Sequence, residues 1–321
     1  MRLAFFGSGA FGLPTIQHLH GRHNLVMVVT QPDRPAGRKQ KLTPTPIGAW
    51  ALEQGLPVER HENVNEGDFV ERVSALGLDA AVVIAFGQKL GEPLIAAMGS
   101  LAVNLHGSLL PAYRGAAPVQ RAVMDGLKTT GVSVIGLAQR MDAGLVYATA
   151  DLAIEATDTS GDVHDRLAAL GPEAITRVLD QLAADALSPQ IQDELLATRA
   201  RKLTKAEGTI HFAADAMDAA AARALINGLN PWPGCRVACL SPTGERREVI
   251  LRRVQDETAG ADDTASPGTV LDGLRVATSS GVVRLLELQG PGTKQMPAEA
   301  FAAGHGLAVG DRLEPWVFAK P

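Results

Sequence analysis

Residues 79–86, Asp-Ala-Ala-Val-Val-Ile-Ala-Phe, form a nearly continuous apolar run, which limits the possible folds more than any other feature of the chain. Such a run is typical of a central parallel strand that is covered on both faces, because a strand facing water alternates polar and apolar residues. Similar runs at 2–6 and 25–30 alternate with helical patterns at 13–19 and 47–54. The sequence therefore predicts an α/β fold with a Rossmann-like, doubly wound parallel sheet.

A further apolar segment, residues 101–105, leads directly into polar side chains and a loop rich in Gly and Pro. Asn104 and His106 are two residues apart, so both are expected to project to the same side of a strand. An amide N–H beside an imidazole suits the oxyanion that develops during acyl transfer. Ligands of doubly wound sheets bind outside the carboxyl ends of the strands, which makes this strand end a candidate site.

A carboxylate, Asp142, follows the apolar run at 131–138 and is predicted to lie at the same edge of the sheet. An Asp before Ala-Gly is also a common turn residue. Ser108 lacks the G-x-S-x-G context of a nucleophile elbow, so the attacking group should come from the substrate. His106, tuned or oriented by Asp142, could then serve the proton transfers while Asn104 holds the carbonyl oxygen.

The segment Gly7-Ser8-Gly9-Ala10-Phe11-Gly12 matches the G-x-G-x-x-G pattern that dinucleotide-binding proteins carry after their first strand. The next strand, however, ends in Gln31-Pro32, where an acidic residue for a ribose is expected. Two interpretations follow. The chain is either a nicotinamide-dependent oxidoreductase, or the glycines form a tight strand-to-helix turn that packs closely or holds another ligand.

A long polar connection covers residues 31–46, whereas a simple strand-to-helix link takes about 2 to 6 residues. Its basic residues, set against only Asp33, are Arg34, Arg38, Lys39 and Lys41. This pattern indicates either a solvated loop or an arm that contacts phosphates. Because the net charge of the chain is -5, a nucleic acid partner would have to be held by such local patches.

The pattern changes from Asp185 onward, where a polar, irregular stretch includes Lys202 and Lys205. Short β-type runs between Gly and Pro turns follow, and their spacing suggests a small OB-like β-barrel. A chain of 321 residues is long enough for one large and one smaller domain. The predicted domains are a catalytic domain at 1–185, a linker at 186–207 and a barrel at 208–321.

The sequence does not have the features of a membrane protein or of a zinc-binding protein. No run of about 18 apolar residues exists, and Met1 leads directly into a strand pattern, so a cytoplasmic location is expected. Cys235 and Cys239 stand four residues apart without the second ligand pair that a zinc site needs. We expect two ordinary thiols and no metal.

Four segments resemble the folate-dependent formyltransferases: Asn104-Leu105-His106, Ser108-Leu109-Leu110-Pro111, Arg114-Gly115-Ala116-Ala117-Pro118 and Asp142-Ala143-Gly144. The resemblance implies that 10-formyltetrahydrofolate is the formyl donor. It also implies a formyltransferase-type fold, with Asn104, His106 and Asp142 as the catalytic residues. The folate would be contacted by Ser108, Leu109, Leu110 and Pro111, with Phe86, Gly87 and Gln88 beside the pterin.

Three further segments resemble those members of the family that formylate the α-amino group of methionine on initiator tRNA. They are residues 31–38, Lys202-Leu203-Thr204-Lys205 and Asn230-Pro231-Trp232-Pro233. This implies that a charged initiator tRNA is the partner. The residues expected to contact the tRNA are Arg34, Arg38, Lys39, Lys41, Lys202 and Lys205. We also expect the enzyme to be a monomer. Residues 201–321 carry 14 Lys+Arg and 14 Asp+Glu, so their tRNA contacts are expected at local basic edges near Arg246, Arg247, Arg252 and Arg253.

Two other functions remain open on the sequence. A formyltransferase acting on an amino sugar or a sugar nucleotide shares the Asn-x-His pair and the distant Asp, but it needs no basic arm. An RNA-binding protein without catalytic activity would leave the constellation of Asn104, His106 and Asp142 without a use.

Overall fold

The computed structural model describes residues 1–37, 40–214, 217–257 and 265–318 of the chain. It divides into two compact units that are interleaved along the sequence. The first comprises 1–115, 131–152 and 164–199; the second comprises 116–130, 153–163 and 200–321. The predicted linker at 186–207 is thus divided between the units. No helix in the described ranges is long and apolar enough to cross a membrane.

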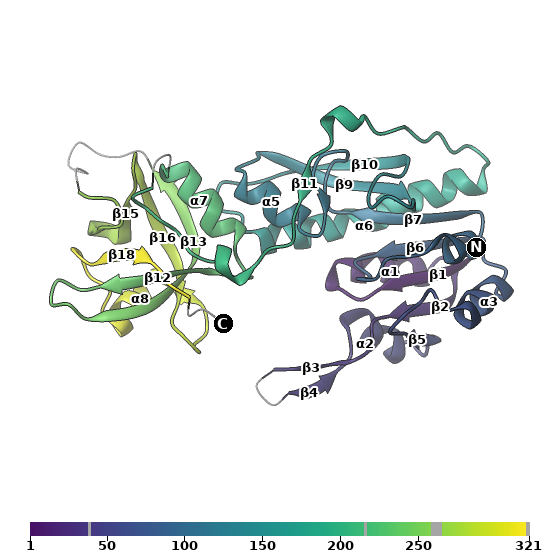
Figure 1. Ribbon diagram of the computed structural model, residues 1–321, viewed down its shortest axis with the longest axis horizontal. Coiled ribbons are helices and arrows are strands. Elements are labelled where there is room, and N and C mark those ends of the chain that lie inside the picture. The colour runs from purple at the N-terminus through teal and green to yellow at the C-terminus, as the bar shows by residue number, and fades with distance from the viewer. Residues whose placement is uncertain (38–39, 215–216, 258–264, 319–321) are drawn as a thin grey trace. The chain divides into compact units, whose positions relative to one another are not determined.

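The first unit is built on a seven-stranded sheet with the strand order β10-β9-β7-β6-β1-β2-β5 (Figure 1). The strands are β1 (Arg2–Gly7), β2 (Asn24–Thr30), β5 (Val58–Arg60), β6 (Ala80–Ile84), β7 (Leu101–His106), β9 (Thr129–Gly136) and β10 (Val146–Ala153). Neighbours from β7 to β5 pair in parallel, as the apolar runs predict. β6 is buried at every position, which explains its uninterrupted apolar sequence.

Helices cover both faces of this sheet. On one face, Phe69 of α3 (Gly67–Ala75) and Leu94 of α4 (Glu92–Ala97) join a buried cluster with Ala4 and Phe6 of β1. On the other face lie α1 (Leu13–His20), α2 (Pro46–Glu53) and α6 (Ser160–Ala183). Because side chains alternate along a strand, residues 4 and 6 face the first layer while residues 3 and 5 face the second.

Helix α6 continues through Gly171-Pro172, although a proline inside a helix removes a backbone hydrogen bond and usually breaks or kinks it. The structure has one helix of 24 residues with Pro172 inside it. A Cβ atom at Gly171 would lie 2.4 Å from Thr15 Oγ1 and 2.7 Å from Leu105 Cδ2. The glycine is therefore needed for close packing of α6 against α1 and β7, and the helix continues because this packing outweighs the local cost of the proline.

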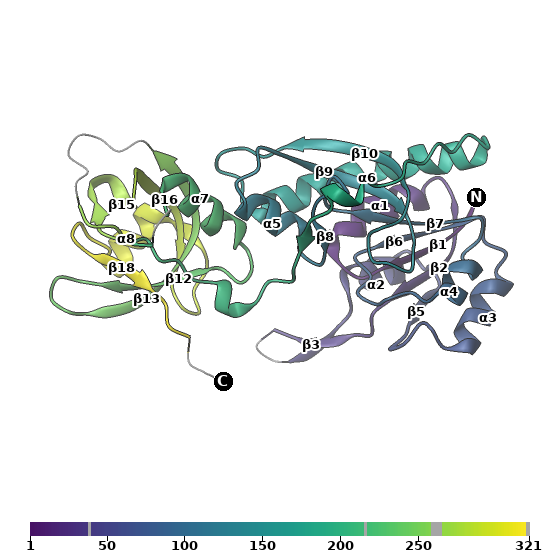
Figure 2. The same cartoon turned by 45° about the horizontal axis from the view of Figure 1, so that its top comes forward.

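The long connection at 31–46 contains a two-stranded hairpin, β3 (Arg34–Ala36) and β4 (Lys41–Thr43). At its base, the hydroxyl groups of Thr30 and Thr45 are hydrogen-bonded. Arg60, at the end of β5, donates to Asp33 at 2.8 Å. In both views the hairpin projects from the rest of its unit (Figures 1 and 2).

The second unit contains a sheet with the order β14-β15-β16-β13-β12-β18, in which β17 (Met296–Pro297) also pairs with β16. These strands are β12 (Cys235–Leu240), β13 (Arg246–Glu257), β14 (Val270–Leu271), β15 (Arg275–Ala277), β16 (Val282–Gln289) and β18 (Arg312–Pro315). Neighbouring strands in this order pair antiparallel, as do β16 and β17. Backbone bonds from Val270 to Asp311 and from Leu313 to Gly268 join the two ends of this order, as the barrel prediction requires.

The helices of the second unit are α5 (Pro118–Met124), α7 (Ala219–Gly228) and α8 (Ala298–His305). Ile226 of α7 and Phe301 of α8 are almost fully buried in the core of the barrel. Cys235 and Cys239 lie in the same core, so both are buried free thiols.

Candidate active site

The candidate site residues of β7 project to one face because successive residues of the strand alternate between two environments. Leu105 packs toward Gly171 of α6, whereas Ala102 packs against the cluster under α3 and α4. Asn104 and His106 share the side of Ala102, as the two-residue spacing predicts. Among the residues that the structure describes, none is hydrogen-bonded to the half-buried side chain of Asn104. Its amide is thus available to a ligand.

His106 and Asp142 lie together. The distance from His106 Nδ1 to Asp142 Oδ1 is 3.7 Å, and the two side chains are only 7% and 14% exposed. The other ring nitrogen, Nε2, is 2.9 Å from the carbonyl oxygen of Tyr113. A carbonyl can only accept a hydrogen bond, so Nε2 carries a proton and Nδ1 is the atom that faces the carboxylate. Asp142 is held in turn by its Oδ2 atom, which accepts from the backbone N–H of Gly115 at 2.8 Å.

Asp142 reaches this position by a route that the sequence does not indicate. Strand β9 is antiparallel to β7, and Gly136 lies opposite Val103, so β9 ends away from the carboxyl end of β7. The first residue of the loop between β9 and β10, Leu137, donates its N–H to the carbonyl of Ala102 at 2.9 Å and packs against the cluster under α3 and α4. This places Asp142 on the face that carries His106, with a positive φ of 55°. The carboxylate therefore reaches His106, the last residue of β7, through the loop after β9, whereas the prediction assumed that the strand before Asp142 ends at the same edge as β7.

The Ser108-Leu109-Leu110-Pro111 segment is held from within. The Ser108 hydroxyl donates to the carbonyl of Ala112 at 2.7 Å, and the Ser133 hydroxyl donates to the carbonyl of Ser108 at 2.8 Å. The same Ser133 hydroxyl accepts from Leu110 N–H at 3.0 Å. The polar groups of the loop are therefore used to shape it, and this leaves half-buried apolar surface at Leu109 and Pro111 for a ligand.

The segment beside the end of β6 is also built into the fold. The side chain of Phe86 is 3% exposed and packs edge-on against Phe6, with ring centroids 5.5 Å apart. The Gln88 amide donates to His61 O at 2.7 Å and accepts from Val64 N–H at 3.1 Å. Gly87, by contrast, is exposed with a φ of 88°. A ligand at this strand end can therefore meet backbone at 85–87, whereas the Phe86 ring is enclosed.

The G-x-G-x-x-G glycines are explained by packing. A Cβ atom at Gly7 would lie 2.9 Å from Ile84 O and 2.6 Å from the Phe5 ring, and one at Gly12 would also meet these two residues. The chain passes through a short 3-10 helix, Ala10–Gly12, before α1 begins. This is the tight strand-to-helix turn that the sequence left open as an alternative to a dinucleotide site.

The predicted tRNA-binding residues are distributed over both units. In the first, Lys41 is exposed on β4, and Arg34 on β3 pairs with Glu62 at 3.0 Å. Arg38 and Lys39 lie outside the described residues. In the second, Lys202 and Lys205 are exposed.

The predicted basic edge of the barrel makes contacts within the second unit. Arg247 pairs with the buried Asp311 at 2.6 Å, and Arg253 pairs with Asp162 at 2.9 Å. Arg252 bonds to Gln289, while Arg246 lies over the Trp316 ring at 5.9 Å. At least three of these four arginines therefore hold the barrel together.

A buried polar network beside Asp142 was missed by the sequence analysis. The side-chain amide of Gln192 donates to the carbonyl oxygens of Asp142 and Gly144, both at 2.8 Å. Its oxygen accepts from Arg114 Nε at 3.0 Å and Nη2 at 2.6 Å. Arg114 also pairs with Glu194 at 3.0 Å. Hydrogen bonds from Arg114 and then from Arg140 lower the pKa of Glu194 to about 2.

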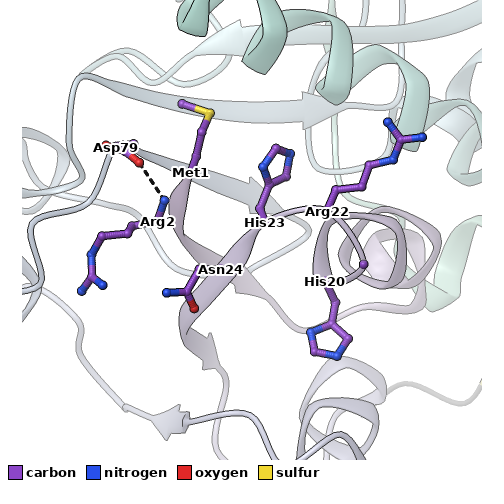
Figure 3. A pocket seen from close by; sticks show the side chains of 8 residues that line it. Met1, Arg2, His20, Arg22, His23, Asn24 and Asp79 are labelled. Atoms are coloured by element: carbon purple, nitrogen blue, oxygen red, sulfur yellow. Dashed lines mark hydrogen bonds between the residues drawn. The ribbon is translucent and has the colours of Figure 1, made fainter.

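A hollow at the opposite edge of the sheet, where β1 and β2 begin, is shown in Figure 3. It is lined by Met1, Arg2, His20, Gly21, Arg22, His23, Asn24 and Asp79. The backbone N–H of Arg2 donates to Asp79 at 2.7 Å across it. Burial, followed by the nearby N-terminal amine, lowers the pKa of His23. Within the described ranges no group of three or more His, Cys, Asp or Glu residues is placed to hold a metal ion.

Comparison with known proteins identifies similar chains over nearly the whole length. The family model for formyl transferases matches residues 1–179, and that for the formyl transferase C-terminal domain matches residues 202–306. A methionyl-tRNA formyltransferase of Heliobacterium modesticaldum is 38% identical, over 98% of this chain and 100% of that one. One from Paracoccus denitrificans is 39% identical, also over 98% and 100%.

Solved structures show the same fold at low sequence identity. An N-formyltransferase from Helicobacter canadensis, in complex with folinic acid and dTDP-3-aminofucose, has a TM-score of 0.66 at 11% identity. The alignment covers 88% of this chain and 98% of the Helicobacter canadensis chain. HypX from Aquifex aeolicus, in complex with tetrahydrofolic acid, has a TM-score of 0.62 at 15% identity. It covers 100% of this chain and 50% of its own.

Proposed function

This chain belongs to the formyl transferase family, and on that premise we propose that it is a methionyl-tRNA formyltransferase. The reaction transfers the formyl group of 10-formyltetrahydrofolate to the α-amino group of methionine on initiator tRNA. The supporting observation is the similarity to methionyl-tRNA formyltransferases over 98% of the chain, which extends through both matched regions. The product serves translation initiation, so we place the enzyme in the cytoplasm.

The proposed chemistry is a direct acyl transfer. The methionyl amine attacks the formyl carbon, a new C–N bond forms, and the bond from that carbon to N10 of the folate breaks. One proton leaves the amine and one arrives at N10, so tetrahydrofolate departs neutral at that nitrogen. The side chains of the chain need only bind, orient and move this proton, because the substrate supplies the nucleophile.

Three side chains have roles that fit this reaction. The Asn104 amide, which is free of protein partners among the described residues, would donate to the oxygen that gains negative charge. His106 Nδ1 and Asp142 Oδ1, 3.7 Å apart, would take the proton from the amine and return it to N10. Nε2 is occupied by the Tyr113 carbonyl, so the proton is exchanged on the Nδ1 side of the ring.

The donor and acceptor would meet different parts of the first unit. We assign the folate to the half-buried apolar surface of Leu109 and Pro111, on either side of the buried Leu110, and to the backbone at 85–87. Gly87 is exposed there, whereas the Phe86 ring and the Gln88 amide are engaged by the fold. The exposed Lys41 on the β3–β4 hairpin would contact tRNA phosphates, with Lys202 and Lys205 doing so from the second unit.

The deciding experiment is a formyl-transfer assay with the purified chain, 10-formyltetrahydrofolate and initiator tRNA charged with methionine. The proposal expects formylmethionyl-tRNA to accumulate in proportion to tetrahydrofolate. Uncharged tRNA is the control for the acceptor. Formylation of a dTDP-amino sugar in place of the charged tRNA would instead assign the enzyme to the sugar formyltransferases.

A further inference from the structure

Gln192 is a buried carboxamide within a segment that the sequence predicts to be a linker. Its residue is 8% exposed, although neighbouring Ile191 is 87% exposed. Polar side chains enter a protein interior only when their hydrogen-bonding groups find partners. Here both amide hydrogens and both lone pairs of the oxygen are used, in the four bonds to Asp142, Gly144 and Arg114.

These bonds fasten the segment along the loop that carries Asp142. Gln190 and Val146 pair through their backbones in both directions at 2.8 Å, in an antiparallel bridge. Gln192 then bonds to residues 142 and 144, and Glu194 pairs with Arg140. Residues 190–194 and 140–146 thus run in opposite directions, and they contact each other from one end of the loop to the other.

The loop needs such support because its backbone is strained at the reacting residue. Asp142 has a φ of 55°, in the left-handed region that costs a residue with a side chain about 1 kcal/mol or more. Gly144 lies so close to β9 that a Cβ atom there would overlap the carbonyl of Gly136. Gln192 binds the carbonyl oxygens on both sides of this turn, so it fixes the peptide planes that set the direction of the Asp142 side chain.

We propose that Gln192, itself oriented by Arg114, is a positioning residue for Asp142 in formyl transfer. The inference rests on the proposed function and adds to it a requirement that lies outside the three reacting side chains. Arg114 links the two sides of the site, because the next residue, Gly115, donates its N–H to the Asp142 carboxylate. A group misplaced by about 1 Å can lower a rate 100-fold, so loss of this support should affect turnover more than binding.

The test variant is Gln192→Glu, which keeps the size of the side chain and its acceptor for Arg114 but lacks the two N–H donors. We expect kcat to fall about 10- to 100-fold, with KM for 10-formyltetrahydrofolate and for charged tRNA changed less than about threefold. Gln190→Glu is the matched control, since that side chain is exposed in the same segment. It should leave kcat unchanged.

A double-mutant cycle separates positioning from general support of the fold. Added to Asp142→Ala and followed in single turnovers, Gln192→Glu should cost less than about threefold, because the residue that it positions is absent. An equal loss in both backgrounds, or a kcat within threefold of wild type in the single variant, would overturn the inference. Arg114→Lys tests the same network if Gln192→Glu does not fold, and failure of both to fold would also count against it. Absence of formyl transfer by the wild-type chain would reject the proposed function instead.

Discussion

Replacing Asp142 with Asn tests the proposed proton-transfer pair directly. The substitution removes one negative charge and keeps the size of the side chain, and the remaining oxygen can still accept from Gly115 N–H. The structure therefore predicts little change in the loop, but a large change in the charge facing His106 Nδ1.

The expected magnitude follows from the distance and the burial. A unit charge 3.7 Å from a protonated imidazole interacts by about 4.5 kcal/mol at an effective dielectric constant of about 20. Since every 1.36 kcal/mol is tenfold in rate, this corresponds to about 10³ if the full interaction exists only in the transition state. The dipole of the new amide retains part of it, so we expect kcat to fall by about 10² to 10³.

The assay is formyl transfer to charged initiator tRNA, measured over a range of both substrates. Asp151→Asn is the matched control, because it removes the same charge from an exposed position on β10. We expect wild-type kinetics from that control. A kcat within about threefold of wild type for Asp142→Asn would refute the role of the carboxylate, and a large rise in KM with unchanged kcat would make Asp142 a binding residue.

Four further outcomes follow from the same structure. Asn104→Ala should lower kcat by about 10² to 10³ through loss of an oxyanion donor, and rates near wild type would remove this residue from the mechanism. Lys41→Ala should weaken tRNA binding and reduce its salt slope by about one, which a titration at several salt concentrations checks. Burial raises the pKa of both thiols, that of Cys239 to about 12, so Cys235 and Cys239 should resist iodoacetamide until the chain unfolds; rapid labelling of native protein would contradict this. Glu194, whose pKa is about 2, contributes stability that is present above its unfolded value of 4.5 and lost as the pH falls through 2. Glu194→Gln should therefore lower the melting temperature at pH 7 but not near pH 2.

The parallel part of the sheet was predictable because its strands are buried on both faces. The short, uninterrupted apolar sequence of β6 is rich in β-branched residues, which favours a buried strand over a buried helix, and β1 and β2 are similarly apolar. The direction of β9 was not predictable, because a buried strand has the same apolar pattern whether it runs parallel or antiparallel to its neighbour. The hairpin β3–β4 was also missed, because its residues are polar and it covers only three residues per strand.

The candidate site also contains residues that were predictable from the sequence and residues that were not. Asn104 and His106 were placed on one side by a local rule, the two-residue period of a strand. The contact of His106 with Asp142 was expected from a resemblance and from an assumed strand direction, and the structure reaches it by a different path. Gln192 gave no signal, because its partners lie about 50 residues away and a Gln in an irregular stretch looks like any solvated residue.

The loop that carries Asp142 needs support from another segment, because it follows an antiparallel strand. In a strand-helix-strand crossover, the sheet itself would fix a residue at a strand end. Here Asp142 lies in the loop after an antiparallel strand; the first residue of this loop, Leu137, donates its N–H to Ala102 of β7, and Asp142 lies beyond the paired strands. A second segment therefore has to hold it from outside, and residues 190–194 do so through backbone, amide and ion-pair contacts. The polar composition that makes this segment resemble a linker is thus what allows it to bind the carbonyl groups of the strained turn at 142–144.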